Sequence, residues 1–477
     1  MNLKIERGNE SMLRSIRFSK LSFVVVLTLV LTMIVSACGG GTKSSSSPSP
    51  STSAATTNAT PTKEAEKEPV KIKVWTQNRS AMDVMNGMVK EFNTKNKDIQ
   101  IEYITQSDDF SKVLTLALQT NQAPDIFAGA GVAGLDFIQN KWALPIEGLV
   151  DQKLIDRLHK FDANQTIDSK IYSLPTAAVT TALIYNKDLF RKAGLDPNKP
   201  PQTLSEVKEA AKKITEASKG EAFGFGVPLK WRGYTEWGLL PSSIAPYKDL
   251  SQLAYNTKTG EFQLEVFKPA VELVRDIVKN KWAFPGASSL DNDPMRSAFA
   301  EGKIGMFIGA SWDVGVLNDQ FTSKVDWAVA PVPVPDGTKM QNGFLNASGG
   351  FLIWSGTKYP KEAAKVFEFI TGAEVSRSLQ KAGKILALDP EAKGSQYQSS
   401  AKGISGFVVT DTSQAVMTPP AYLMDIKGET FAQVMSRLIL TNDPVDSTLK
   451  DLSKRYNEAY QVAVQSGKLK KELFLKK

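Results

Sequence analysis

Val70-Lys71-Ile72-Lys73-Val74-Trp75 begins the part of this 477-residue chain that decides its fold. The stretch alternates apolar and polar side chains, which is the pattern of a β-strand with one buried face. Helical patterns at 82–93 and 110–120 alternate with further strand patterns at 99–105 and 124–127. Strands separated by helices predict a parallel sheet covered on both faces, so we predict an α/β fold. Such sheets bind ligands beyond the carboxyl ends of their strands, where we expect the functional side chains.

Further α/β units follow later in the chain. A strand pattern at 182–185 leads into a helix that Asn186 can cap, and a longer helix is expected at 204–218. Asp293 is expected to cap another helix, with Pro294 in its first turn, ahead of a glycine-containing strand. The α/β pattern therefore extends well beyond the first sheet.

The first 37 residues have the layout of a signal peptide. Basic residues precede an apolar run at 21–35, which is shorter than the roughly 20 residues that span a bilayer. The run ends in Val35-Ser36-Ala37-Cys38, which resembles the bacterial lipobox, where the cysteine sulfur receives a diacylglyceryl group before cleavage. The alternative is an ordinary cleaved signal with an accidental cysteine, but the chain has no second cysteine for a disulfide. We therefore predict removal of residues 1–37 and lipidation of Cys38, with palmitate among the attached chains.

Residues 38–69 are expected to form the lipidated end and a disordered tether. The segment is rich in Ser, Thr and Pro and has too few large apolar side chains to repay the entropy of ordering. Its extended length allows a reach of up to about 100 Å. We expect the folded part to be held by this tether at the extracytoplasmic face of the cell membrane.

The composition limits what the folded part can be. About 400 residues beyond the tether are suited to two domains rather than one core. The formal net charge is +8, but the basic residues are scattered among acidic ones and form no extended basic patch. Nucleic-acid binding is therefore not expected. His159 is the single histidine, which leaves no His/Cys metal cluster, and no phosphate-binding loop of the G-x-x-x-x-G-K-[ST] type occurs. We expect no metal, no cofactor and no catalysis.

Five segments resemble, in order, the carbohydrate-binding group of extracellular solute-binding proteins of ABC importers, the group related to maltose-binding protein. They are Gln122–Phe127, Leu183–Phe190, Ala298–Met306 running into Trp312, Ala347–Phe351, and the helix at 360–372. The resemblance implies a periplasmic-binding-protein-like fold, in which two α/β lobes enclose the ligand by a hinge motion. It places the crossings between the lobes near 178–183 and 345–350. The implied lobes are 70–180 with 350–410, and 181–349 with 411–477.

A sugar site needs flat aromatic rings for the C–H faces of the ligand and polar groups for its hydroxyls. Trp231, Tyr234 and Trp237 recur every third residue, and the alternative is that they pack against the core of lobe two. The family places a ligand-stacking tryptophan where Trp312 stands. Asp125, before the strand residues Ile126-Phe127, is expected to have a structural role. The candidate ligand-binding residues are Gln77, Asn78, Tyr185, Trp231, Tyr234, Trp237, Trp312, Gly350 and Tyr422.

One segment departs from the family pattern. Where maltose-binding proteins carry aromatic and charged ligand contacts after the strand at 124–127, this chain has the small residues Ala128-Gly129-Ala130-Gly131-Val132-Ala133-Gly134. We therefore expect a roomier site that depends on the aromatic residues of lobe two. Such a site suits an oligosaccharide better than maltose.

These observations predict a lipid-anchored, monomeric receptor that captures a sugar and delivers it to the membrane permease of an ABC importer. A receptor for a polyamine, peptide or anion is the first alternative, and it would need charged groups in place of indoles. An anchored glycan-active enzyme or adhesin is the second, and turnover of a polysaccharide would distinguish it.

Overall fold

The computed structural model describes residues 68–106, 110–129, 132–159, 161, 166–167, 170–231, 233–341, 345–348, 350–392, 394–407 and 419–476. The predicted signal peptide, Cys38 and nearly all of the predicted tether lie outside these residues. Among the helices in the described ranges, none is both long enough and apolar enough to cross a membrane.

The first sheet has four strands in the order β13-β3-β1-β2. β1 (Val70–Thr76) lies parallel to both β2 (Ile99–Thr105) and β3 (Ile126–Ala128), as the alternation of strands and helices predicted. β13 (Phe351–Ile353) pairs antiparallel with β3 and comes from much later in the chain. A segment from after residue 350 therefore returns to complete the first sheet, as the resemblance implied.

Both faces of this sheet are covered. Ile126 belongs to a core cluster with α2 (Met82–Lys95) and α12 (Pro360–Thr371), whereas the next residue, Phe127, packs in a separate cluster with α3 (Phe110–Gln119). The expected structural role of Asp125 is confirmed, because its carboxylate accepts from the backbone N–H of Lys73 at 2.9 Å and from Thr357 Oγ1 at 2.5 Å.

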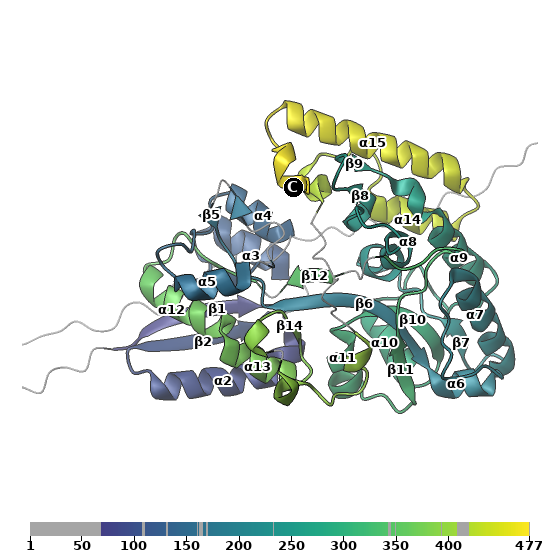
Figure 1. Cartoon of the computed structure of the whole chain (residues 1–477), viewed down its shortest axis with the longest axis horizontal. Coiled ribbons are helices and arrows are strands. Elements are labelled where there is room, and N and C mark those ends of the chain that lie inside the picture. Colours follow the sequence, from purple (N-terminus) through teal and green to yellow (C-terminus); the bar gives the residue numbers. More distant parts are fainter. Residues whose placement is uncertain are drawn as a thin grey trace, which may run out of the picture. The chain divides into compact units, whose positions relative to one another are not determined.

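The second sheet has the strand order β11-β6-β10-β7. Its longest member, β6 (Ala177–Asn186), is buried along all ten residues. β10 (Ile304–Ala310) and β11 (Trp327–Ala330) flank it in antiparallel register, and β7 (Phe223–Phe225) lies parallel to β10. Figure 1 shows β6 as one continuous strand.

β6 also pairs through its first residues with β12 (Leu345–Ser348) and β14 (Leu386–Ala387). The same strand thus changes partners near Thr180, close to where the sequence predicted the first crossing, and β12 lies where the second crossing was expected. The lobe boundaries themselves stay a prediction. The short 3₁₀ helix Ile404–Gly406 packs on β11 of the second sheet. We therefore expect the first lobe to end before Ile404 and not at residue 410.

One predicted helix cap is confirmed, one predicted pair of helix limits is confirmed, and one predicted cap is wrong. Asn186 Oδ1 accepts from two backbone N–H groups at the start of α6 (Lys187–Lys192), as expected. α7 (Leu204–Ser218) has the predicted limits. The prediction of Asp293 as a cap is wrong, because Asp291 caps α10 (Asn292–Ala300) and Asp293 lies in its first turn, where it pairs with Arg296.

The remaining elements complete the two cores. α9 (Lys268–Lys279) packs with α14 (Phe431–Leu440) and α15 (Val445–Gln465), so the C-terminal part of the chain joins the core around the second sheet. The others are α4 (Val132–Gln139), α5 (Gln152–His159), α8 (Leu240–Ile244), α11 (Asp313–Gly315), α13 (Ala373–Lys381), and the two-stranded pairs β4 (Thr166–Ile167) with β5 (Lys170–Ile171) and β8 (Tyr255–Asn256) with β9 (Glu261–Phe262).

Candidate functional site

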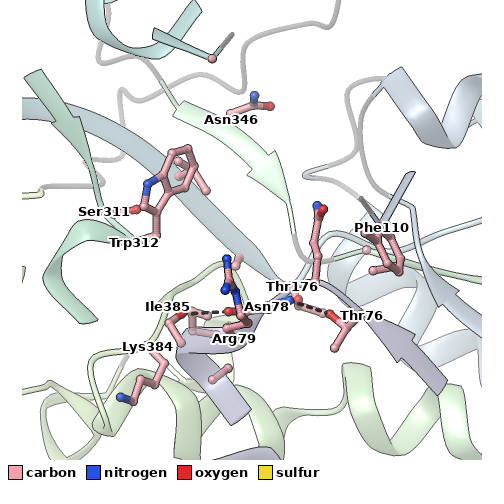
Figure 2. Close-up of a pocket in the computed structure, with 18 of the residues that line it drawn as sticks. Thr76, Asn78, Arg79, Phe110, Thr176, Ser311, Trp312, Asn346, Lys384 and Ile385 are labelled. Atoms are coloured by element: carbon pink, nitrogen blue, oxygen red, sulfur yellow. Dashed lines mark hydrogen bonds between the residues drawn. The ribbon is translucent and has the colours of Figure 1, made fainter. Parts of the chain in front are cut away.

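A cavity of about 820 Å³ lies where the two sheets end. Thr76 closes β1, Ala128 closes β3 and Ser311 follows β10, and all three line the cavity. Figure 2 shows Ser311 and Trp312 beside one strand and Thr76 and Asn78 at the end of another. The site is therefore at the carboxyl ends of strands, as expected for an α/β sheet.

The structure brings most of the predicted ligand-binding residues to this one cavity. Those that line it are Gln77, Asn78, Trp231, Trp237, Trp312 and Gly350. The end of β3 and the residue after it, Ala128 and Gly129, line the cavity, so small side chains border it there. Residues 130 and 131 lie outside the described part.

Two of the predicted tyrosines are placed in the core and do not line the cavity. The hydroxyl of Tyr185 donates to the Pro197 carbonyl at 3.0 Å, and its ring packs against Phe190. Tyr234 is 2% exposed within the core cluster of the second sheet, and burial raises the pKa of its phenol. Tyr422 lies in the 3₁₀ turn Pro420–Leu423, and its side chain is outside the described part.

The aromatic residues of the cavity combine two roles that the sequence offered as alternatives. Trp231 and Trp237 both line the cavity, and both also pack, partly buried, against the core of the second sheet. The π-helix Tyr234–Leu239 carries both Trp237, which lines the cavity, and Tyr234, which is buried in the core. Short π-helical segments are frequently found at functional sites.

The loop after β1 is fixed by its own hydrogen bonds. The backbone N–H of Asn78 donates to Thr76 Oγ1 at 3.2 Å, and Ser80 Oγ donates to Asn78 Oδ1 at 2.8 Å (Figure 2). The Ser80 hydrogen bond orients the Asn78 carboxamide, whose NH₂ group can donate to a ligand and whose oxygen keeps a second lone pair to accept with.

A buried arginine supports the opposite wall. Arg296 Nε donates to Asp313 Oδ1 at 2.7 Å, and Nη1 donates to Asp293 Oδ1 at 2.9 Å. Burial opposes the charge of the guanidinium, but the two carboxylates outweigh it and raise the pKa of Arg296 above its ordinary value. The side chain therefore stays cationic and is already paired with anions.

A second ion pair joins segments from the two cores. Lys384 follows α13, whose Val375 and Leu379 belong to the core around the first sheet. Asp319 lies in the π-helix Val316–Gln320 that follows α11. Their Nζ and Oδ2 atoms are 2.5 Å apart, and Lys384 lines the cavity. Asp319 does not itself line the cavity, so the pair links the two cores at the edge of the site.

Reasoning from the sequence missed most of the polar lining. The missed residues include Arg79, Tyr103, Glu236, Asn292, Asp293, Arg296, Gln320, Asn346 and Lys384. One signal was present, because Asn292 and Arg296 are four residues apart and thus share a helix face. Among the residues described, no three His, Cys, Asp or Glu side chains gather where they could hold a metal ion.

The cavity between two α/β cores is the arrangement of a solute receptor, and comparison with known families decides the assignment. A model of the bacterial extracellular solute-binding proteins matches residues 76–376. The chain belongs to this family. The predicted resemblance is thereby confirmed for most of the folded part of this solute-binding protein.

Individual relatives bind different solutes. The solute-binding protein is 26% identical over 408 residues to the maltotriose-binding protein of Pyrococcus abyssi, covering 81% of each chain. It is 26% identical to the sn-glycerol-3-phosphate-binding periplasmic protein of Brucella melitensis, covering 67% of this chain and 76% of the relative.

Solved structures confirm the two-lobed fold. The GacH receptor of Streptomyces glaucescens, known unliganded and with acarbose, superposes with a TM-score of 0.65 at 18% identity, covering 83% of this chain and 99% of that one. The expected fold class is therefore confirmed, and family and fold are those of binding proteins.

Proposed function

We propose that this solute-binding protein captures a neutral sugar, of oligosaccharide size, and delivers it to the permease of an ABC importer. The observation that carries the proposal is the pair of indoles, Trp237 and Trp312, in one cavity with Asn78, Asp293 and Glu236. Aromatic faces suit the apolar C–H surfaces of a sugar, and carboxylates and amides suit its hydroxyls. The cavity volume of about 820 Å³ leaves room for more than one sugar ring.

An anionic ligand is the strongest alternative, because one relative is named for binding sn-glycerol 3-phosphate. A phosphate site needs cations that are free to pair with it. Three cationic side chains line the cavity among the described residues. Arg296 is paired with Asp293 and Asp313, Lys384 is paired with Asp319, and Arg79 is the third. A phosphate bound by Arg296 or Lys384 would compete with those carboxylates, which favours an uncharged ligand on that side of the cavity.

A thermal-shift screen of the mature chain without its lipid tests the sugar assignment. The probes are maltotriose, raffinose, sn-glycerol 3-phosphate, spermidine and a tripeptide. A ligand at a hundred times its Kd stabilises the folded state by about 2.7 kcal/mol, so a micromolar binder is readily detected. Stabilisation by a sugar supports the proposal, and stabilisation by charged probes alone would overturn the sugar assignment while leaving the receptor role intact. Hydrolysis of the bound sugar would instead favour an enzyme.

The lipid anchor is part of the same proposal and rests on the sequence around Cys38. Expression of the full chain in a bacterial host, followed by separation of membranes, is expected to place it in the membrane fraction. The Cys38→Ala variant is expected to lose incorporation of radiolabelled palmitate. Equal labelling of both chains would contradict lipidation at this cysteine.

A further inference from the structure

Arg296 connects two separate parts of the cavity wall. It projects from α10 and is only 8% exposed, and its guanidinium contacts both the start of its own helix and the segment after β10. Buried ion pairs contribute little to stability on average, because desolvation offsets the attraction. A role in orienting the surrounding side chains explains this arginine better than a role in stability.

The first contact fixes the segment that carries Trp312. Asp313 is 3% exposed. Its Oδ1 accepts from Arg296, whose Nη2 lies 2.5 Å away. Its Oδ2 accepts from the backbone N–H of Ala310 at 2.7 Å. The carboxylate thus closes the turn from Ala310 to Asp313. Gly309 makes this approach possible, because a Cβ there would lie 2.7 Å from Asp313 Oδ2.

The second contact orients two polar side chains on the cavity wall. With its carboxamide oxygen facing the guanidinium, Asn292 accepts from Arg296 Nη2 at 3.1 Å and from Nη1 at 3.3 Å. Asp293 Oδ1 accepts from Nη1 at 2.9 Å. Within the described residues, no donor bonds to the second carboxylate oxygen of Asp293, Oδ2, and no acceptor bonds to the NH₂ group of Asn292.

This arrangement places a donor beside an acceptor. A sugar hydroxyl can donate to the carboxylate of Asp293 while its neighbour on the ring accepts from the amide of Asn292. Two adjacent hydroxyls offer this pair of functions. Trp312 lines the same cavity and can contact the apolar face of the sugar ring.

We propose that Arg296 is the positioning residue of this wall, and that Asn292 and Asp293 bind a vicinal diol of the sugar whose apolar face rests on Trp312. The diol contact rests on the proposed function. The positioning of Trp312 does not, because it is a property of the protein without ligand.

The positioning role is tested in the unliganded mature chain labelled with 5-fluorotryptophan. The Trp312 resonance is assigned by comparison with Trp312→Phe, and Arg296→Met is expected to shift or broaden it. Arg296→Lys, which keeps one charge but loses the fork of donors, is expected to restore it only in part. An unchanged Trp312 resonance in Arg296→Met would overturn the positioning role.

The control is Arg275→Met. Arg275 is a partly buried arginine outside the cavity lining that donates to the Leu438 and Asp443 carbonyls. Its loss is expected to lower the melting temperature without moving the Trp312 resonance. A shift of equal size in this variant would show that the resonance reports general destabilisation, and the inference would fall.

The diol contact is tested by calorimetry with maltotriose and raffinose. For a sugar that the wild type binds, Asp293→Asn and Asn292→Ala are each expected to raise Kd by about 10- to 100-fold, because a charge-assisted or buried hydrogen bond is lost. Wild-type affinity in both variants would overturn the diol contact. If the wild-type chain binds neither sugar but binds sn-glycerol 3-phosphate, the proposed function and the diol contact fail together, while the fluorine resonance still decides the role of Arg296.

Discussion

The indole rings of Trp237 and Trp312 meet edge to face, with ring centroids 5.0 Å apart and planes inclined by 68°. The two residues come from different segments of the second core, a π-helix and the turn after β10. An edge-to-face pair restrains each ring through the other, so the aromatic surface is in place before a ligand arrives. Preorganisation of this kind lowers the entropic cost of binding.

Trp312→Ala is expected to raise the Kd of the sugar found in the thermal-shift screen by about 10- to 100-fold, because it removes a stacking surface from the centre of the site. Isothermal titration calorimetry measures the change. The melting temperature is expected to fall little, since the side chain is only partly buried.

Trp282→Ala is the matched control for this substitution. Trp282 is a partly buried tryptophan that packs on the same core but does not line the cavity. It is expected to lower the melting temperature and leave Kd within about twofold of the wild type. Equal losses of affinity in both variants would mean that Trp312 acts through stability alone.

The fold was largely predictable from the sequence because its local signals agree with one another. The strand at 99–105 and the helix at 204–218 have the limits that hydrophobic periodicity predicted. β6 is longer than predicted, because ten consecutive buried residues carry no alternation to mark where the strand begins. The cap at Asp291 was missed because Asp291 and Asp293 are equally good capping residues by type.

The site was predictable only in part. Aromatic residues and the positions after strands pointed to Trp312 and Asn78, which do line the cavity. Tyr185 was misplaced because every residue of β6 is buried, so the sequence alone does not say which face meets the cavity. Lys384 and Asp319 are 65 residues apart, and no local pattern reports a contact of that separation.

Gly224→Ala is expected to destabilise the protein by about 1–3 kcal/mol, since a methyl group there would overlap with the backbone of Ala211, which cannot move out of the way as a flexible side chain could. Gly87→Ala is the control, because nothing lies within 4 Å of an added Cβ at this position in α2. It is expected to stabilise by about 0.5–1 kcal/mol. Urea unfolding measures both, and equal effects of the two substitutions would contradict the packing of β7 on α7.

Stability is expected to fall at alkaline pH in part through Tyr103. Burial raises the pKa of this phenol to about 12, above its ordinary value of about 10. Between these values the unfolded chain has lost the proton while the folded chain keeps it, so stability declines as the pH rises from about 10 through about 12 and is unaffected below.

Tyr103→Phe removes that contribution, and its unfolding free energy is expected to decline less steeply over the same interval. Urea unfolding at a series of pH values measures the slopes. The difference between the two proteins at pH 8 gives the packing effect of the hydroxyl alone. Parallel curves up to pH 12 would show that the phenol titrates equally in the folded and unfolded states.

Lys384 and Asp319 are expected to act together as a latch between the two cores at the edge of the cavity. Their ion pair joins a segment of the first core to the π-helix of the second, at 2.5 Å. Closure around a ligand is favoured by contacts that exist only when the two sides are together. Lys384→Met is therefore expected to raise the Kd for the bound sugar by about two- to fivefold, the size of a partly exposed ion pair, and to speed its release.

Lys384→Met, Asp319→Asn and the double variant together distinguish a latch from two independent side chains, with Lys192→Met as the control. If the pair is the active unit, Asp319→Asn gives the same loss as Lys384→Met, and the double variant is no worse than either. Lys192→Met breaks an ion pair with Glu221 outside the cavity lining and is expected to leave Kd unchanged. Stopped-flow measurement of sugar release, following tryptophan fluorescence, gives the rates. Losses that add in the double variant would show that Lys384 and Asp319 contribute separately, and an unchanged release rate in all three would show that closure does not depend on this contact.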